Sequence, residues 1–147
     1  MNEKHLDIRK QQLNLLASAS PCIRRKVSAL IVAPGSNVVI SEGYNGTPRQ
    51  SISVLCGGDK CLRENITSGL NNDVGCHHAE MNAILNAGRI GTSCINTWML
   101  TSCDPCLMCS KAIHHAGITK VYAPLNYAEH RAGLEYLQDN QVVLEKI

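Results

Sequence analysis

Two cysteines with metal-binding spacing, Cys106 and Cys109, follow Pro105 in the segment Asp-Pro-Cys-Leu-Met-Cys. Pro105 suits the first turn of a helix, and two thiols three residues apart then share one helical face and can reach one ion. A helix N-terminus lowers the pKa of a thiol and so favours the thiolate that binds zinc. His78 offers a third ligand, and a Cys₂His set leaves one position of a tetrahedral zinc open, as in catalytic sites.

Glu80 decides between the interpretations that the cysteine pair allows. By itself, a Cys-x-x-Cys pair is as typical of a redox pair, or of half of a closed structural zinc site, as it is of a catalytic zinc site. A carboxylate two residues after a zinc-binding His78 is placed to contact the water on the metal and can take its proton. His-x-Glu followed by Pro-Cys-x-x-Cys is the signature of zinc deaminases, so the pattern predicts that Glu80 is the catalytic proton carrier.

Hydrophobic patterning and turn residues predict the elements that must bring these residues together. The predicted helices cover residues 6–17, 79–87, 106–116 and 129–139, and the predicted strands cover residues 27–33, 38–44, 97–101, 120–124 and 141–145. An opening hairpin, then strands alternating with helices, predicts an α/β fold with a mixed sheet and helices on both faces. Residues 45–75 show no clear period, and so long a connection needs something to pin it.

Length and composition favour one domain over residues 1–147. No segment has the ~18 apolar residues of a membrane span and the N-terminus lacks a signal peptide, so we expect a cytoplasmic protein without a membrane partner. In that reducing compartment, grouped cysteines indicate metal binding or chemistry rather than disulfides. A net charge of +2 and the scarcity of aromatic residues argue against a long nucleic acid as partner.

Five segments resemble the deoxycytidylate (dCMP) deaminases of phage and bacterial type, within the cytidine deaminase superfamily. They are Cys-Ile-Arg-Arg-Lys-Val at 22–27, Gly-Tyr-Asn-Gly-Thr-Pro at 43–48, Cys-Leu-Arg-Glu at 61–64, His-Ala-Glu-Met-Asn-Ala-Ile at 78–84 and Pro-Cys-Leu-Met-Cys at 105–109. The resemblance implies a cytidine deaminase-like three-layer α/β/α fold with a five-stranded mixed sheet. The second and fourth segments look like the dCMP branch rather than the tRNA adenosine deaminases.

The resemblance implies hydrolytic deamination of dCMP to dUMP and ammonia, which would feed thymidylate synthesis. Hydroxide on zinc would attack C4 of the pyrimidine, while Glu80 carries a proton to N3 and then to the leaving amine. The catalytic zinc would be held by His78, Cys106 and Cys109. In a phage, the site of action would be the cytoplasm of the host.

The resemblance also assigns three substrate-binding residues, with Asn45 at the sugar, Tyr127 on the pyrimidine ring and Ala79 beside them. From the residues alone, Asn45 before a glycine is as typical of a turn as of a sugar-binding residue. Tyr127 is as typical of an ordinary half-buried tyrosine as of a residue that packs on the pyrimidine. The phosphate of the nucleotide has four candidate partners, which are Lys26, Arg49, Arg63 and His130.

A second, structural zinc is implied by the resemblance for the remaining grouped cysteines, Cys22, Cys56, Cys61 and Cys76. Such an ion would tie the long segment 45–75 to the end of the first helix and to the catalytic helix. His77 is a rival for the last ligand position, and buried free cysteines are the alternative to any site. Cys94 and Cys103 remain without a role.

Regulation is a further expectation of the resemblance, which implies a homo-oligomer, favoured as a hexamer, activated by dCTP and inhibited by dTTP, with Mg²⁺ accompanying the triphosphate. The regulatory residues would be Gly43, Tyr44, Gly46 and Arg89. Arg89 is equally typical of a surface arginine at a helix C-terminus. Ser28 departs from the family, which usually has Gly there, and its hydroxyl puts details of nucleotide fit in doubt.

Two other functions are compatible with the same residues. The zinc and Glu80 could act on dCTP, a free base, a pterin-like ring or an anticodon adenosine, and pocket shape decides among these. A zinc-stabilised binding module without catalysis is the alternative from another class, and it would have no need of Glu80.

Overall fold

The structure of the protein, a computed structural model, describes residues 1–51, 56, 59–71 and 74–147. Its helices and strands are α1 (Glu3–Ser18), β1 (Ser28–Val32), β2 (Val39–Tyr44), α2 (Ala79–Arg89), β3 (Trp98–Thr101), α3 (Leu107–His115), β4 (Lys120–Ala123), α4 (Arg131–Asp139) and β5 (Val143–Lys146). The predicted order of elements is confirmed. None of the described helices is both long and apolar enough to cross a bilayer.

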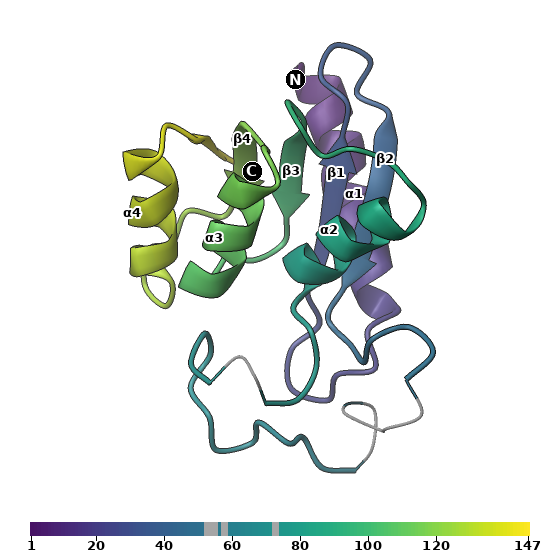
Figure 1. Cartoon of the computed structure of the whole chain (residues 1–147), viewed down its shortest axis with the longest axis vertical. Coiled ribbons are helices and arrows are strands. Elements are labelled where there is room, and N and C mark those ends of the chain that lie inside the picture. Colours follow the sequence, from purple (N-terminus) through teal and green to yellow (C-terminus); the bar gives the residue numbers. More distant parts are fainter. Residues whose placement is uncertain (52–55, 57–58, 72–73) are drawn as a thin grey trace.

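One five-stranded sheet runs through the molecule in the order β2-β1-β3-β4-β5 (Figure 1). β1 is antiparallel to β2 and to β3, whereas β3, β4 and β5 are parallel to one another. Parallel neighbours need long crossovers, and α3 and α4 supply them. The predicted mixed sheet is therefore confirmed, and the carboxyl ends of β3 and β4 lie at the same edge of the sheet.

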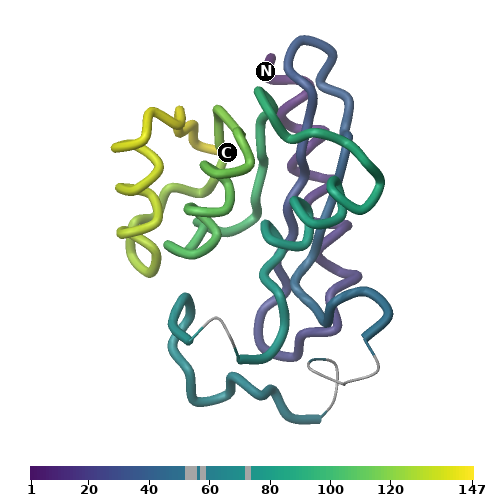
Figure 2. The backbone as a smooth tube through the Cα atoms, viewed as in Figure 1, coloured from purple at the N-terminus to yellow at the C-terminus, as the bar shows by residue number. Residues whose placement is uncertain are grey.

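Helices cover both faces of the sheet and complete three layers. Leu13 of α1 packs with Leu30 and Leu100 on one face, whereas the core on the other face contains Ala83 of α2 and Ile113 of α3. All five residues of β1 are buried because the strand is covered on both faces, which explains its continuous apolar run. Figure 2 shows the described part of the connection from β2 to α2 beyond the end of the sheet where α2 begins.

Gly43 allows α2 to lie directly on β2. A Cβ at Gly43 would come within 2.4 Å of the Ala83 backbone nitrogen and 2.5 Å of the Ala79 carbonyl oxygen. Asn82 also donates to the Tyr44 carbonyl at 2.8 Å. These contacts hold the start of α2, which carries the predicted zinc ligand and proton carrier, so Gly43 has a packing role whatever its part in regulation.

Ser28, the departure from the family pattern, is fully buried and faces α1. Its hydroxyl donates to the Leu13 carbonyl at 2.6 Å. The hydroxyl thus joins β1 to α1, on the face of the sheet opposite α2 and α3.

Candidate active site

Three predicted metal ligands meet where α2 and α3 begin. His78 is the N-cap of α2, Cys106 is the N-cap of α3, and Cys109 lies in the first turn of α3. His78 Nδ1 lies 3.5 Å from the sulfur of each cysteine. Among the described residues, these three form the one group of potential metal ligands whose atoms all lie within 4.8 Å of one another. The fold therefore brings together the three residues predicted to bind the catalytic zinc.

The geometry of this group fits zinc. Bonds of ~2.3 Å to sulfur and ~2.0–2.1 Å to nitrogen, meeting at the tetrahedral angle, place nitrogen and sulfur roughly 3.5 Å apart. The two distances from His78 match that separation. Three protein ligands leave a fourth position for water or substrate, which is the arrangement of catalytic zinc sites.

The charges of the group also favour a cation. Hydrogen bonds from Cys109, and then from His78, lower the pKa of the Cys106 thiol to about 3. The same pairing with Cys106 raises the pKa of Cys109 well above its ordinary value, because two adjacent thiolates repel each other. A divalent ion between the sulfurs would remove this repulsion and allow both cysteines to bind as thiolates.

Glu80 is buried beside the three ligands, with only 3% of its surface exposed. It lies in the first turn of α2, two residues after His78. Burial raises the pKa of its carboxyl group to about 7, although the nearby His78 lowers it. A carboxyl group with a pKa near neutrality can both accept and release a proton at physiological pH, as a proton carrier must.

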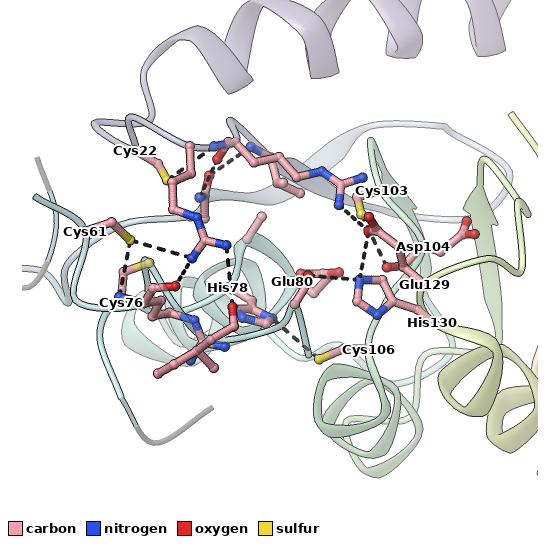
Figure 3. Close-up of a pocket in the computed structure, with 18 residues that line it drawn as sticks. Cys22, Cys61, Cys76, His78, Glu80, Cys103, Asp104, Cys106, Glu129 and His130 are labelled. Carbon is pink, nitrogen blue, oxygen red and sulfur yellow. Dashed lines mark hydrogen bonds and ion pairs between the residues drawn. The ribbon is translucent and has the colours of Figure 1, made fainter. Parts of the chain in front are cut away.

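A cavity of about 350 Å³ opens over His78, Glu80 and Cys106. Its other lining residues are Cys22, Arg24, Arg25, Val27, Asn45, Cys61, Arg63, Ile66, Ser68, Cys76, Ala79, Cys103, Asp104, Glu129 and His130. Figure 3 shows Glu80 between His78 on one side and Asp104, Glu129 and His130 on the other. Ligands, proton carrier and a space for a small molecule therefore coincide.

Of the three predicted substrate residues, Ala79 and Asn45 line the cavity and Tyr127 is not among its lining residues. Asn45 is buried, with 8% of the residue exposed, and its side chain is held by other residues of the protein. Its oxygen accepts from Ser20 Oγ and from the Val27 amide, each at 2.8 Å, and its nitrogen donates to a backbone carbonyl. Asn45 thus first of all joins the segment before β1 to the segment after β2.

Of the four residues proposed for the phosphate, Arg63 and His130 line the cavity. Lys26 and Arg49 lie outside the cavity lining, and Arg63 donates to the backbone carbonyls of Leu70, Asn71 and Val74. Arg63 thereby binds the backbone on either side of residues 72–73, at Leu70 and Asn71 and at Val74. His130 does line the cavity and is buried.

Sequence reasoning missed Arg25, whose guanidinium group lines the cavity and pairs with Glu129 at 2.5 Å. The two residues are 104 positions apart in the chain. Arg25 lies in the segment 22–27, one of the five that carry the resemblance, but no role in the site was predicted for it. Only the fold brings Arg25, together with Arg24, to the cavity.

The four cysteines predicted for a second zinc lie near one another without forming a compact ligand group of the kind described above. Cys56 is close enough to Cys22 and to Cys76 for the pKa values of these thiols to affect one another, and Cys61 is close enough to Cys76 to raise its pKa further. Burial, together with the neighbouring Cys76 and Cys22, raises the pKa of Cys56 to about 12. Cys22 lies in the segment between α1 and β1, whereas the other three lie in the connection between β2 and α2.

Backbone amides point at two of these sulfurs. The Arg25 amide donates to Cys22 Sγ at 3.5 Å and the Arg63 amide to Cys61 Sγ at 3.4 Å. Such donors stabilise thiolates.

His77, the rival for the last ligand position of the second zinc, has its Nδ1 3.3 Å from Asn82 Oδ1.

The other two cysteines are buried in different places. Cys94 belongs to the core on the α2 and α3 face of the sheet, whereas Cys103 lines the cavity. Burial raises the pKa of Cys103 to about 12, so its thiol is neutral at physiological pH.

The predicted regulatory residues lie around β2 and α2. Gly46 pairs with His77 through two backbone hydrogen bonds of 3.0 and 3.1 Å, which place the chain just before the ligand His78. Arg89 donates to Gln50 at 2.9 Å and lines, with Arg49, a groove beside β2.

Comparisons with known proteins agree with this site. Residues 2–124 match the family model described as the cytidine and deoxycytidylate deaminase zinc-binding region. The chain is 38% identical to the deoxycytidylate deaminase of Schizosaccharomyces pombe over 84% of its own length, and 33% identical to that of Saccharomyces cerevisiae over 90%. It spans only 38% and 41% of those two relatives.

A phage enzyme of known structure has the same fold over its whole length. The dCMP deaminase of cyanophage S-TIM5, solved in complex with dCMP and dUMP, superposes with a TM-score of 0.76 at 26% identity, over 100% of this chain and 99% of that chain. Its apo form superposes with a TM-score of 0.78.

Proposed function

This chain belongs to the cytidine and deoxycytidylate deaminase family, and we propose that it is a zinc-dependent enzyme that hydrolyses dCMP to dUMP and ammonia, supplying dUMP for thymidylate synthesis. The observation that carries the proposal is the position of Glu80, a buried carboxyl group in the same cavity as the ligands His78 and Cys106. A binding module would not need a proton carrier there. The names of the relatives and the ligands of the phage structure support dCMP as the substrate.

In the proposed mechanism, zinc held by His78, Cys106 and Cys109 would lower the pKa of a water toward neutrality. The carboxylate of Glu80 accepts a proton from the attacking water and delivers it to N3 of the pyrimidine. Glu80 then takes the proton of the hydroxyl group on C4 and transfers it to the amine, so that the C4–N bond breaks, ammonia leaves and the C4 carbonyl forms. The walls around Glu80 restrict bulk water and hold the ring against the ligands.

The substrate proposal is tested by assaying ammonia release from dCMP, CMP, dCTP and deoxycytidine with the purified protein. We expect dCMP to be the preferred substrate. A preference for dCTP would support the proposed deamination chemistry but contradict dCMP as the substrate. Zinc binding without activity on any of the four would favour the binding module.

We propose that Arg25 binds the substrate phosphate. It lies on the cavity wall, and its partner Glu129 can be displaced because both side chains are about half exposed and such pairs contribute little, roughly 0–1 kcal/mol. A phosphate makes stronger, bidentate hydrogen bonds with a guanidinium group. His130 is a second candidate partner in the same wall.

Replacing Arg25 by alanine should raise KM for dCMP by about 10- to 100-fold, which corresponds to the ~1.5–3 kcal/mol of a hydrogen bond to a charged group. The KM for deoxycytidine, which has no phosphate, should hardly change. Steady-state kinetics with both compounds provide the measurement. Arg131→Ala is the matched control, because Arg131 is exposed and outside the cavity lining. Equal losses on both compounds would contradict the phosphate role.

We also propose a structural zinc at Cys22, Cys56, Cys61 and Cys76, supported by the proximity of these thiols and by the amide donors to Cys22 and Cys61. The protein should then contain about two zinc ions per chain, and Cys61→Ser should reduce this to about one while lowering the melting temperature. Metal analysis and thermal unfolding measure both effects. Cys94→Ser, at a cysteine outside both groups, should retain both ions. A wild-type content of one zinc would contradict the second site.

We propose in addition that dCTP and dTTP regulate the enzyme, with Mg²⁺ bound to the triphosphate. The same proposal includes a hexameric assembly and regulatory roles for Gly43, Tyr44, Gly46 and Arg89. A groove with two guanidinium groups, Arg49 and Arg89, supports an anionic effector. Neither forms an ion pair within the described part of the chain. Titrating both nucleotides into the dCMP assay, with light scattering for the assembly, tests these points. A cytoplasmic location belongs to the same proposal, because a reducing compartment keeps grouped cysteines available to bind metal.

A further inference from the structure

Asp104 is a buried carboxylate that binds three successive backbone amides. It is 6% exposed and accepts from the amides of Leu125 and Asn126 at 2.7 Å each and of Tyr127 at 3.2 Å. Successive amides that converge on one anion form a strong binding arrangement, and hydrogen bonds to an ionised acceptor are stronger than neutral ones. Asp104 therefore anchors the chain just after β4.

The anchored segment has a backbone conformation that needs an anchor. Leu125 and Tyr127 have φ values of +53° and +56°, in the left-handed region. Neither residue is glycine, and residues with a Cβ occupy this region only where the surroundings impose it. Without the carboxylate, residues 125–127 would relax toward ordinary conformations and change the direction of the chain that follows.

The chain that follows forms one wall of the cavity. Glu129 and His130, immediately beyond the anchored segment, both line it. Asp104 itself is two residues before the zinc ligand Cys106 and is joined to it through the rigid ring of Pro105. One side chain thus connects the turn that carries a metal ligand to the opposite wall of the site.

A second contact joins the same two parts. A Cβ at Gly133 in α4 would lie 2.2 Å from the Pro105 carbonyl oxygen, so α4 rests directly on the turn that contains Cys106. Gly133 fixes the helix, whereas Asp104 fixes the segment that leads into it. Along the chain, His130 lies between Tyr127, which Asp104 holds, and Gly133.

We propose that Asp104 is a positioning residue, which aligns the wall formed by Glu129 and His130 with the metal ligands and thereby sets the affinity for the nucleotide. The metal and Glu80 are held by α2 and α3, so chemistry should continue when the wall moves. The inference uses the proposed function only in choosing dCMP as the probe.

The test is Asp104→Asn in the zinc-loaded protein, with Asp139→Asn as matched control, because Asp139 is exposed at the end of α4. Asparagine keeps the shape but has one acceptor oxygen and an NH₂ group, which cannot receive the remaining amides. We expect KM for dCMP to rise about tenfold or more, kcat to change less than about threefold, and zinc content to stay unchanged, since a tenfold effect equals the loss of one such hydrogen bond. Hydrogen exchange at the amides of residues 125–127 should accelerate, while α2 and α3 keep their protection.

Two results would overturn the inference. One is a KM within about twofold of the control together with unchanged exchange at residues 125–127. The other is a parallel loss of zinc, kcat and α3 protection, which would place the action of Asp104 on the metal site. If Asp104→Asn does not fold, Asp104→Ser, which leaves room for a bridging water, is measured in the same way. If the wild type does not deaminate dCMP, the proposed function fails, and the exchange measurement still tests the anchor.

Discussion

Glu80→Gln is expected to lower kcat for dCMP by about 10²- to 10⁴-fold, the usual contribution of a positioned proton carrier. Glutamine has nearly the same shape and can occupy the same buried position, but its neutral amide cannot accept a proton from water or deliver one to N3. The zinc ligands His78, Cys106 and Cys109 remain, so zinc content and melting temperature should stay near those of the wild type. KM should change little, because the cavity walls are intact.

The measurement is ammonia release under single-turnover conditions, with metal analysis on the same preparation. Glu135→Gln is the matched control, since Glu135 is about half exposed on α4 and outside the cavity. Full activity in Glu80→Gln would refute the catalytic proposal and favour a zinc-stabilised binding module. Loss of activity together with loss of zinc would instead mean that Glu80 supports the metal site.

Loss of a zinc ligand should be more severe. Cys109→Ser removes a sulfur from a set of three, and a serine hydroxyl is not ionised at neutral pH and so cannot replace the thiolate. We expect the catalytic zinc to be lost and dCMP deamination to fall by about 10³-fold or more, because the metal supplies several kcal/mol of transition-state stabilisation.

A chelator should reproduce this loss in the wild-type protein, and added Zn²⁺ should restore activity there but not in Cys109→Ser. Cys103→Ser is the control for metal content, because Cys103 lines the same cavity and lies outside the ligand group. Zinc retained at full occupancy in Cys109→Ser would show that another residue completes the site. The two predictions together separate the chemistry of Glu80 from that of the metal.

The most local features of this protein follow from its sequence. Cys106 and Cys109 are three residues apart at the start of a helix, and His78 and Glu80 are two residues apart at the start of another, so their relative positions depend on the geometry of one turn each. The order of helices and strands follows similarly from hydrophobic periodicity, and the apolar run at 27–33 predicted the strand that forms β1.

Tertiary structure alone decided the walls of the site. Arg25 meets Glu129 across 104 positions, and Asp104 meets Leu125 across 21. Asn45, assigned to the sugar by resemblance, has its amide bonded to residues that precede β1, and Arg63, a candidate for the phosphate, binds three backbone carbonyls. A sequence shows which groups carry charge, but the partner that each group finds depends on how β1, β2 and α4 are placed by packing. The chemistry was therefore predictable from local spacing, and the shape of the cavity was not, because contacts between distant segments create it.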